Sequence, residues 1–220
     1  MKRISRSFLA IILLLLAVSS TYAQVSFGIG LKGGLNFASV SFSPELQLGQ
    51  GVTKGGRTGI MFGAAAELGF AKMFYVALEP TYCGKGCSFT AGAVSQTLAY
   101  NYLNLPVLFK VKFLKGMVRP YGFLGPNLGI LLSATSSTTG AAQGNGDVDI
   151  KARTSGTDFA LDFGGGAEIN VMPKLAITGD VRYSLGLGNI DNTTVAAGQT
   201  ATKLTTGGFQ ILFGAMFHIM

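Results

Sequence analysis

The chain lacks tryptophan altogether and has only one histidine, two cysteines and 12% charged residues among its 220 residues. Soluble domains have about 25% charged residues, so the composition argues against an ordinary soluble domain. Beyond the N-terminus there is also no run of about 18 apolar residues, which excludes a helical membrane span there. Since 48% of the residues are hydrophobic, the apolar content must be spread over short segments.

The N-terminal segment has the features of a secretory signal peptide, which we place at residues 1–23. Lys2, Arg3 and Arg6 form a basic region, an apolar stretch follows, and small residues lead to cleavage before Gln24. Removing the signal takes away three of the 17 basic residues and none of the 10 acids, so 14 bases remain and the net charge is +4. The remaining Lys and Arg residues are dispersed without a basic stripe, so nucleic-acid binding is not expected.

Residues 57–70 alternate between two kinds of side chain. Small or charged residues such as Arg57 and Glu67 occupy odd positions, and large apolar residues such as Phe62 and Leu68 occupy even positions. A period of two is typical of a β-strand whose faces meet different surroundings. A soluble sheet would bury the large apolar face and expose long polar side chains. We therefore predict that the large apolar face contacts lipid.

The same alternation recurs in eight segments, which we predict to be strands: 24–40, 57–70, 74–82, 98–113, 119–132, 158–171, 175–185 and 209–219. The connections alternate between long and short: 41–56, 71–73, 83–97, 115–116, 133–156, 172–174 and 187–206. This rhythm is typical of outer-membrane barrels, which have short periplasmic turns and longer extracellular loops. Residues 24–220 are therefore predicted to form one all-β domain, an eight-stranded antiparallel transmembrane up-and-down β-barrel in the cell outer membrane.

Three local features refine this prediction. The first and last strands should pair, because an open edge would leave backbone groups unpaired in hydrocarbon. The opening hairpin should have an odd-numbered turn, which we expect to hold three residues, because both its strands place odd residues inward. Aromatic residues near the short-turn or terminal ends are expected in an interfacial girdle; they are Phe70, Phe74, Phe113 and Phe217.

The first strand contains Gly28, Gly30 and Gly33 in a G-x-G-x-x-G pattern. A dinucleotide site would need a preceding strand, a following helix and an acid about 20 residues further on. Here the pattern lies inside the alternation and no helical pattern follows, so we interpret the glycines as making room in a narrow barrel or allowing the strand to coil.

The inward face carries nearly balanced charge, which predicts an ion-paired interior. Buried charges need partners, and eight strands enclose about enough space for side chains alone. A small-solute conduit is the alternative. Glu67 and Glu79 would repel if they faced each other, so either the register offsets them or Lys110 or an arginine neutralises the pair. The ion-pair candidates are Lys32, Arg57, Glu67, Glu79, Lys110, Lys112, Arg119, Asp162, Glu168, Asp180 and Arg182.

Few residues suit catalysis or metal binding. Cys83 and Cys87 fall in a predicted loop in an oxidising compartment, so they are candidates for a disulfide, with free thiols as the alternative. Two cysteines without neighbouring histidines do not make a zinc site. His218 lies near the periplasmic end of the last strand without a visible nucleophile. We expect no catalysis, no cofactor and no metal.

Three segments resemble the PorT-type outer-membrane β-barrel family of Bacteroidetes-like, Gram-negative bacteria: residues 30–37 (GLKGGLNF), 102–110 (YLNLPVLFK) and 119–126 (RPYGFLGP). The resemblance covers essentially the whole mature chain and implies a small barrel in the cell envelope. One branch of the family is implied in secretion and gliding machinery. The chain departs from the terminal aromatic residue common in such barrels, since it ends His218-Ile219-Met220.

The function expected from these features is a non-catalytic structural scaffold that presents four extracellular loops for interaction. A narrow pore, or an accessory component of an outer-membrane secretion complex, is the alternative. The expected partners are outer-membrane lipid, the barrel-assembly machinery during insertion, and an envelope or secretion-complex protein.

Overall fold

The computed structural model of the protein describes residues 25–44, 48–70, 73–114, 116–140, 144–192 and 203–219. The predicted signal peptide and its cleavage site before Gln24 lie outside these ranges. No helix in the described ranges is long and apolar enough to cross a membrane.

The described chain is almost entirely β-structure. In sequence order the elements are β1 (Ser26–Ser43), β2 (Val52–Phe70), β3 (Phe74–Leu78), β4 (Thr81–Ala91), β5 (Val94–Lys112), β6 (Val118–Thr139), β7 (Gly146–Asp149), the 3-10 helix η1 (Lys151–Arg153), β8 (Thr157–Met172), β9 (Leu175–Gly186) and β10 (Lys203–His218).

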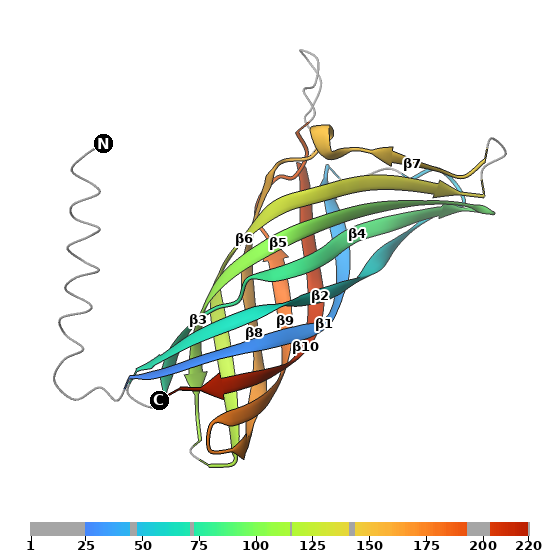
Figure 1. The fold of residues 1–220 in the computed structure, drawn as a ribbon. Helices are drawn as coiled ribbons and strands as arrows, with labels where there is room; N and C mark the ends of the chain where they lie inside the picture. Colours follow the sequence, from blue (N-terminus) through green and yellow to red (C-terminus); the bar gives the residue numbers. More distant parts are fainter. Residues whose placement is uncertain are drawn as a thin grey trace, which may run out of the picture.

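These strands close into an antiparallel barrel with eight wall positions (Figure 1). The ring runs β1, β2, β3 with β4, β5, β6, β8, β9 and β10, and β7 pairs with the far part of β6. β1 and β10 pair from Gly28 opposite His218 to Ser43 opposite Lys203. The predicted pairing of the first and last strands is thus confirmed.

β3 and β4 form one wall position, because both lie between β2 and β5. The interruption falls at Glu79 and Pro80, and Pro80 has no N–H to donate to the ladder. Hydrogen bonds continue across it: the Ala64 N–H donates to the Pro80 carbonyl at 3.0 Å, and the Glu79 N–H donates to the Pro106 carbonyl at 3.2 Å. The wall therefore stays closed at the interruption.

The predicted alternation between lumen and lipid face is confirmed in the strands. In β9, Ala176 is 0% exposed and the next residue, Ile177, is 50% exposed. Large apolar side chains cover the outer wall, and charged side chains are buried inside. A barrel with this arrangement keeps its apolar surface for lipid and its charges for one another.

The end of the barrel with tight turns, which we call the short-turn end, agrees with the prediction. Phe70 pairs with Phe74 across residues 71–73, as the parity of the two strands requires. Phe74, Phe113 and Phe217 are 44%, 59% and 47% exposed at this end, where an interfacial girdle is expected. Phe70 is half-buried there.

Gly30, from the glycine pattern of β1, and Gly34, just after that pattern, allow barrel closure. A Cβ at Gly30 would collide with the carbonyl oxygen of Ala215, and a Cβ at Gly34 would collide with the carbonyl oxygen of Ile211 on β10. The pattern is followed by β2 and not by a helix. Gly30 and Gly34 therefore allow the close approach of β1 and β10, whereas a Cβ at Gly33 would meet nothing closer than 3.6 Å.

The opposite end, which we call the long-loop end, differs from the prediction. Residues 83–97 were expected to be a loop, yet β4 and β5 run through them and meet at a turn at residues 92–93. The predicted loops 41–56, 133–156 and 187–206 are likewise shortened, because the flanking strands continue into them. Above the lipid no face needs to be apolar, so the alternation fades while backbone pairing continues.

This continued pairing builds a sheet beyond the barrel. The pairing of β1 with β2 ends at Ala38 opposite Arg57, whereas β2 continues along β4 and β1 continues along β10. Figure 1 shows β2, β4, β5 and β6 curving together away from the barrel axis, with β7 beside them. We call this part, formed by β7 and the far ends of β2, β4, β5 and β6, the outer sheet.

Candidate functional site in the barrel lumen

The lumen holds almost all the charged residues that alternation placed there. Ten of the eleven predicted ion-pair residues take part in ion pairs: Lys32, Glu67, Glu79, Lys110, Lys112, Arg119, Asp162, Glu168, Asp180 and Arg182. All are buried except Arg119, which is half-buried. The predicted ion-paired interior is present.

Glu168 on β8 organises the charges nearest the short-turn end. Its carboxylate lies 2.6 Å from Lys112 Nζ, 3.1 Å from Arg119 and 3.6 Å from His218 Nε2. The Arg119 guanidinium also donates to the Tyr75 hydroxyl at 2.6 Å. These contacts join β3, β5, β6, β8 and β10 across the lumen. His218 is therefore beside a carboxylate at the predicted end of the last strand.

Glu79 is the centre of the middle part of the lumen. Its carboxylate lies 2.6 Å from Arg182, 2.7 Å from Lys110 and 3.0 Å from Lys32. The side chain is 1% exposed, so the three cations replace the water that would otherwise solvate it. Such a group is stable in the interior only because it is paired on several sides.

The expected conflict between Glu67 and Glu79 is resolved in both of the ways considered. The register places Glu67 opposite Ala77, two residues from Glu79. Lys110 Nζ also lies between the two carboxylates, 3.4 Å from Glu67 and 2.7 Å from Glu79. Lys112 forms a second ion pair with Glu67.

The remaining acids extend the network along β8 and β9. Asp180 contacts Lys32 at 2.6 Å and Arg182 at 3.5 Å, and Asp162 lies 3.6 Å from Arg182. Asp162 also accepts hydrogen bonds from Asn127 at 3.0 Å and Ser184 at 2.6 Å. The network is therefore continuous from Glu168 to Asp162.

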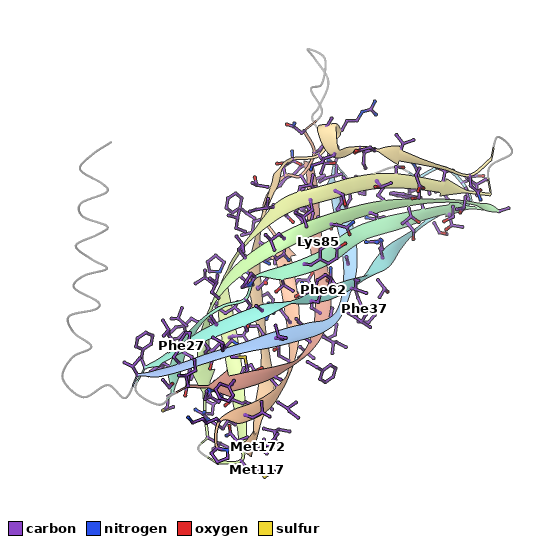
Figure 2. All side chains as sticks on the ribbon, in the orientation of Figure 1. Phe27, Phe37, Phe62, Lys85, Met117 and Met172 are labelled. Atoms are coloured by element: carbon purple, nitrogen blue, oxygen red, sulfur yellow. The ribbon has the colours of Figure 1, made fainter. Side chains whose placement is uncertain are left out.

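Lys85 and Asp158 form a further ion pair that the sequence analysis missed. Their charged atoms are 2.8 Å apart, both side chains are buried, and the Thr206 hydroxyl donates to Asp158 at 2.5 Å. Lys85 lies toward the long-loop end (Figure 2). The sequence predicts a loop here, since the neighbours Gly84 and Gly86 carry no apolar side chain. Lys85 has an odd number like the inward-facing Glu79, and this shared parity is the one signal that indicates a lumen position.

Of the two alternatives for Cys83 and Cys87, the structure has the free thiols: both are buried and unpaired. They lie in strand β4, so their predicted placement in a loop is wrong. Four residues of strand separate their Cα atoms by about 13 Å, and a disulfide requires less than about 7 Å. Arg57 makes no ion pair with any residue in the described ranges; it donates to the Lys85 carbonyl at 3.0 Å.

An apolar cluster fills the lumen above the ion pairs. Val40, Tyr100, Leu131 and Ile190 belong to it, together with Cys87, Tyr102 and Ala134. Ile190 comes from the connection after β9, and its N–H donates to the Leu204 carbonyl at 2.8 Å. A bridge between Thr154 and Asp191 ties this connection to the one after η1. Side chains thus occupy the barrel from the ion pairs to the loops.

Among the described residues there is no group of three or more His, Cys, Asp or Glu side chains arranged to hold a metal ion. The carboxylates of the lumen face cationic side chains of the same chain. The chemistry that the arrangement supports is electrostatic cross-linking of the wall.

A closed barrel with lipid-facing apolar residues and a charged interior defines a transmembrane barrel of the outer membrane. Residues 22–192 match the family model described as Outer membrane protein beta-barrel domain, and the chain belongs to this family. It is an integral protein of the cell outer membrane. In barrels of this class the end with short turns faces the periplasm and the end with longer loops faces the exterior.

Solved structures of small barrels show the same fold. The outer membrane protein OprG from Pseudomonas aeruginosa is 15% identical, with a TM-score of 0.54 over 90% of this chain and 97% of that chain. Neisserial surface protein A is 16% identical, with a TM-score of 0.50 over 88% of this chain and 97% of that chain. No curated protein sequence matches the chain significantly.

Proposed function

We propose that the protein is a non-catalytic structural scaffold that holds its outer sheet and extracellular loops for contact with partners. The observation that carries this proposal is the filled, ion-paired lumen. Its charged residues come from seven of the eight wall positions, including β1 with Lys32 and β2 with Glu67, and the remaining position, β10, places His218 beside Glu168. Cross-links of this kind favour a rigid wall over a passage.

The filled lumen also bears on the narrow-pore alternative. An ion entering from the periplasm would have to displace cations from Glu168 and Glu79, and would then meet the apolar cluster around Ile190. Each step would leave buried charges without partners, which is costly. A pore role is therefore disfavoured.

Bilayer recordings test the closed scaffold. Purified protein in planar bilayers is expected to show little conductance, with an open porin as the positive control. A stable, large conductance would refute the scaffold as proposed, because it would require the ion pairs or the apolar cluster to be displaced.

A second candidate function follows from the resemblance of residues 30–37, 102–110 and 119–126 to PorT-type barrels. A PorT-type protein would be an accessory component of a secretion complex, with a partner in the envelope. The display scaffold would contact its partner at the long-loop end, whereas the accessory component would contact its partner at the short-turn end.

Site-specific photo-crosslinking in native outer membranes separates the candidates. A crosslinker at Val148 on the outer sheet, where the side chain is 62% exposed, samples extracellular partners. One at Met117 at the short-turn end (Figure 2), 68% exposed, samples periplasmic partners. A specific adduct through Val148 supports the display scaffold. A secretion component captured through Met117 alone would replace that scaffold with the accessory role.

A further inference from the structure

The outer wall carries an apolar groove in the described part of the barrel. It has a volume of about 620 Å³, within the range of about 300–1,000 Å³ typical of small-molecule sites. Its lining is contributed by β1, β2, β9, β10 and the residues around the β3–β4 interruption. Four alanines lie in this lining: Ala64, Ala66 and Ala215 on the outer face, and Ala65, whose side chain is buried.

The pairing register explains why the wall is hollow there. Leu31 on β1 lies between Ala215 on β10 and Ala64 on β2, and Ile29 lies between Phe217 and Ala66. Alanines thus occupy places that phenylalanine or leucine covers elsewhere on the outer face. Large side chains, with Phe217 among them, form the edges of the groove.

The groove lies in the half of the wall nearest the periplasm. Phe27, at the short-turn end, and Phe62, further up the wall, mark the rows below and above it in Figure 2. An outer-membrane barrel has an apolar band about 25 Å tall, and each residue of strand adds about 3.3 Å. The groove therefore faces the acyl chains of the periplasmic leaflet.

A cation stands at the periplasmic end of the groove. Lys174 is exposed in the turn before β9, its carbonyl accepts a hydrogen bond from the His218 N–H at 2.8 Å, and the next residue, Leu175, lines the groove opposite Phe217. Within the described ranges, Lys174 has no ion-pair partner. Lys174 is therefore adjacent in the chain to the residue that ends the groove, within side-chain reach of a phosphate there.

We propose that this groove is a binding site for one anionic glycerophospholipid of the periplasmic leaflet. An acyl chain lies against Ala64, Ala66 and Ala215, and the phosphate pairs with Lys174. In a bilayer there is no hydrophobic gain from leaving other lipids, so the preference comes from close packing and from the charge pair. The inference rests on the barrel's place in the membrane and is independent of the scaffold role.

Native mass spectrometry of the detergent-purified barrel, titrated with palmitoyl-oleoyl phosphatidylglycerol, tests the site. The wild type is expected to retain one lipid. Filling the groove with Ala64→Leu and Ala215→Leu should weaken retention about tenfold, because many close contacts are lost together. Both alanines are exposed, so the substitutions leave the lumen untouched.

Two further variants make the test specific. Ala167→Leu makes one Ala-to-Leu change on the outer face of β8, where the residue lies outside the groove, and should bind like the wild type. Lys174→Gln should lower retention of phosphatidylglycerol while leaving that of a neutral diacylglycerol unchanged. Equal retention by the groove-filled double variant and Ala167→Leu would overturn the proposal. The proposal would also be overturned if the wild type formed a dimer and the groove-filling substitutions dissociated it. The occupant of the groove would then be a second copy of the chain.

Discussion

Replacing Glu79 with glutamine perturbs a carboxylate that forms ion pairs with three cations. The substitution keeps the size and shape of the side chain and removes one negative charge from a site that is 1% exposed. Lys32, Lys110 and Arg182 then lose a shared carboxylate. The glutamine amide also presents N–H donors, which cannot accept from these cations.

The magnitude follows from the charge balance and the remaining contacts. The continuous network has five cations and five carboxylates, apart from His218, so the substitution leaves one buried positive charge in excess. Breaking a buried pair costs about 3–5 kcal/mol. Lys32 retains Asp180 at 2.6 Å and Lys110 retains Glu67 at 3.4 Å, so we expect the lower end, about 3 kcal/mol.

Reversible urea unfolding in detergent or lipid vesicles measures this change. The chain has no tryptophan, so far-UV circular dichroism and gel mobility are the suitable probes. The expected result is a lower midpoint with an unchanged slope, because the folded topology is retained. Asp147→Asn is the matched control: Asp147 is exposed in β7, and its change should stay within about 0.5 kcal/mol.

A double variant tests the electrostatic reasoning itself. Adding Lys110→Met to Glu79→Gln restores the balance of charge in the network. The pair should be less destabilised than the sum of the two single variants by about 1–2 kcal/mol, as expected of residues in one network. A Glu79→Gln barrel as stable as the wild type, or additive effects in the double variant, would show that the lumen charges are not coupled as described.

Three further predictions concern the wall. Gly34→Ala should prevent or strongly destabilise barrel closure, because the added Cβ would collide with β10. Gly33→Ala should fold, because the nearest atom to its added Cβ is 3.6 Å away. The yield of folded barrel in detergent is measured for both variants. Cys83 and Cys87 are buried and free, so maleimide should label them only after unfolding, and reductant should not change gel mobility; labelling of the folded barrel would contradict this. Unboiled and boiled samples should migrate differently in detergent gels, and identical migration would contradict a closed barrel.

The alternation in the sequence was sufficient to predict the barrel and the inward residues. Glu67, Lys110 and Asp180 share the face of their strands with small residues, while large apolar residues occupy the other face. A two-residue period is a property of the extended backbone, so it can be recognised without knowing which strands are neighbours. The same parity correctly predicted the turn between Phe70 and Phe74.

The sequence is uninformative where the lipid no longer imposes a pattern on the side chains. Lys85 stands between two glycines in a strand whose outer face is not apolar there, so the segment looked like a loop and its pair with Asp158 was missed. The outer sheet went unrecognised for the same reason. These strands are held by backbone hydrogen bonds, and backbone hydrogen bonds impose little pattern on the polarity of the side chains.

The sequence by itself determined the eight lipid-crossing segments, the face that each turns to the lipid and the near balance of charge inside. Only the tertiary structure decided that Glu79 meets Lys32, Lys110 and Arg182, and that Ala64 and Ala215 flank Leu31 in one groove. The physical reason is that polarity alternates within a strand, whereas the stagger and curvature of a closed barrel set which strands bring their residues together.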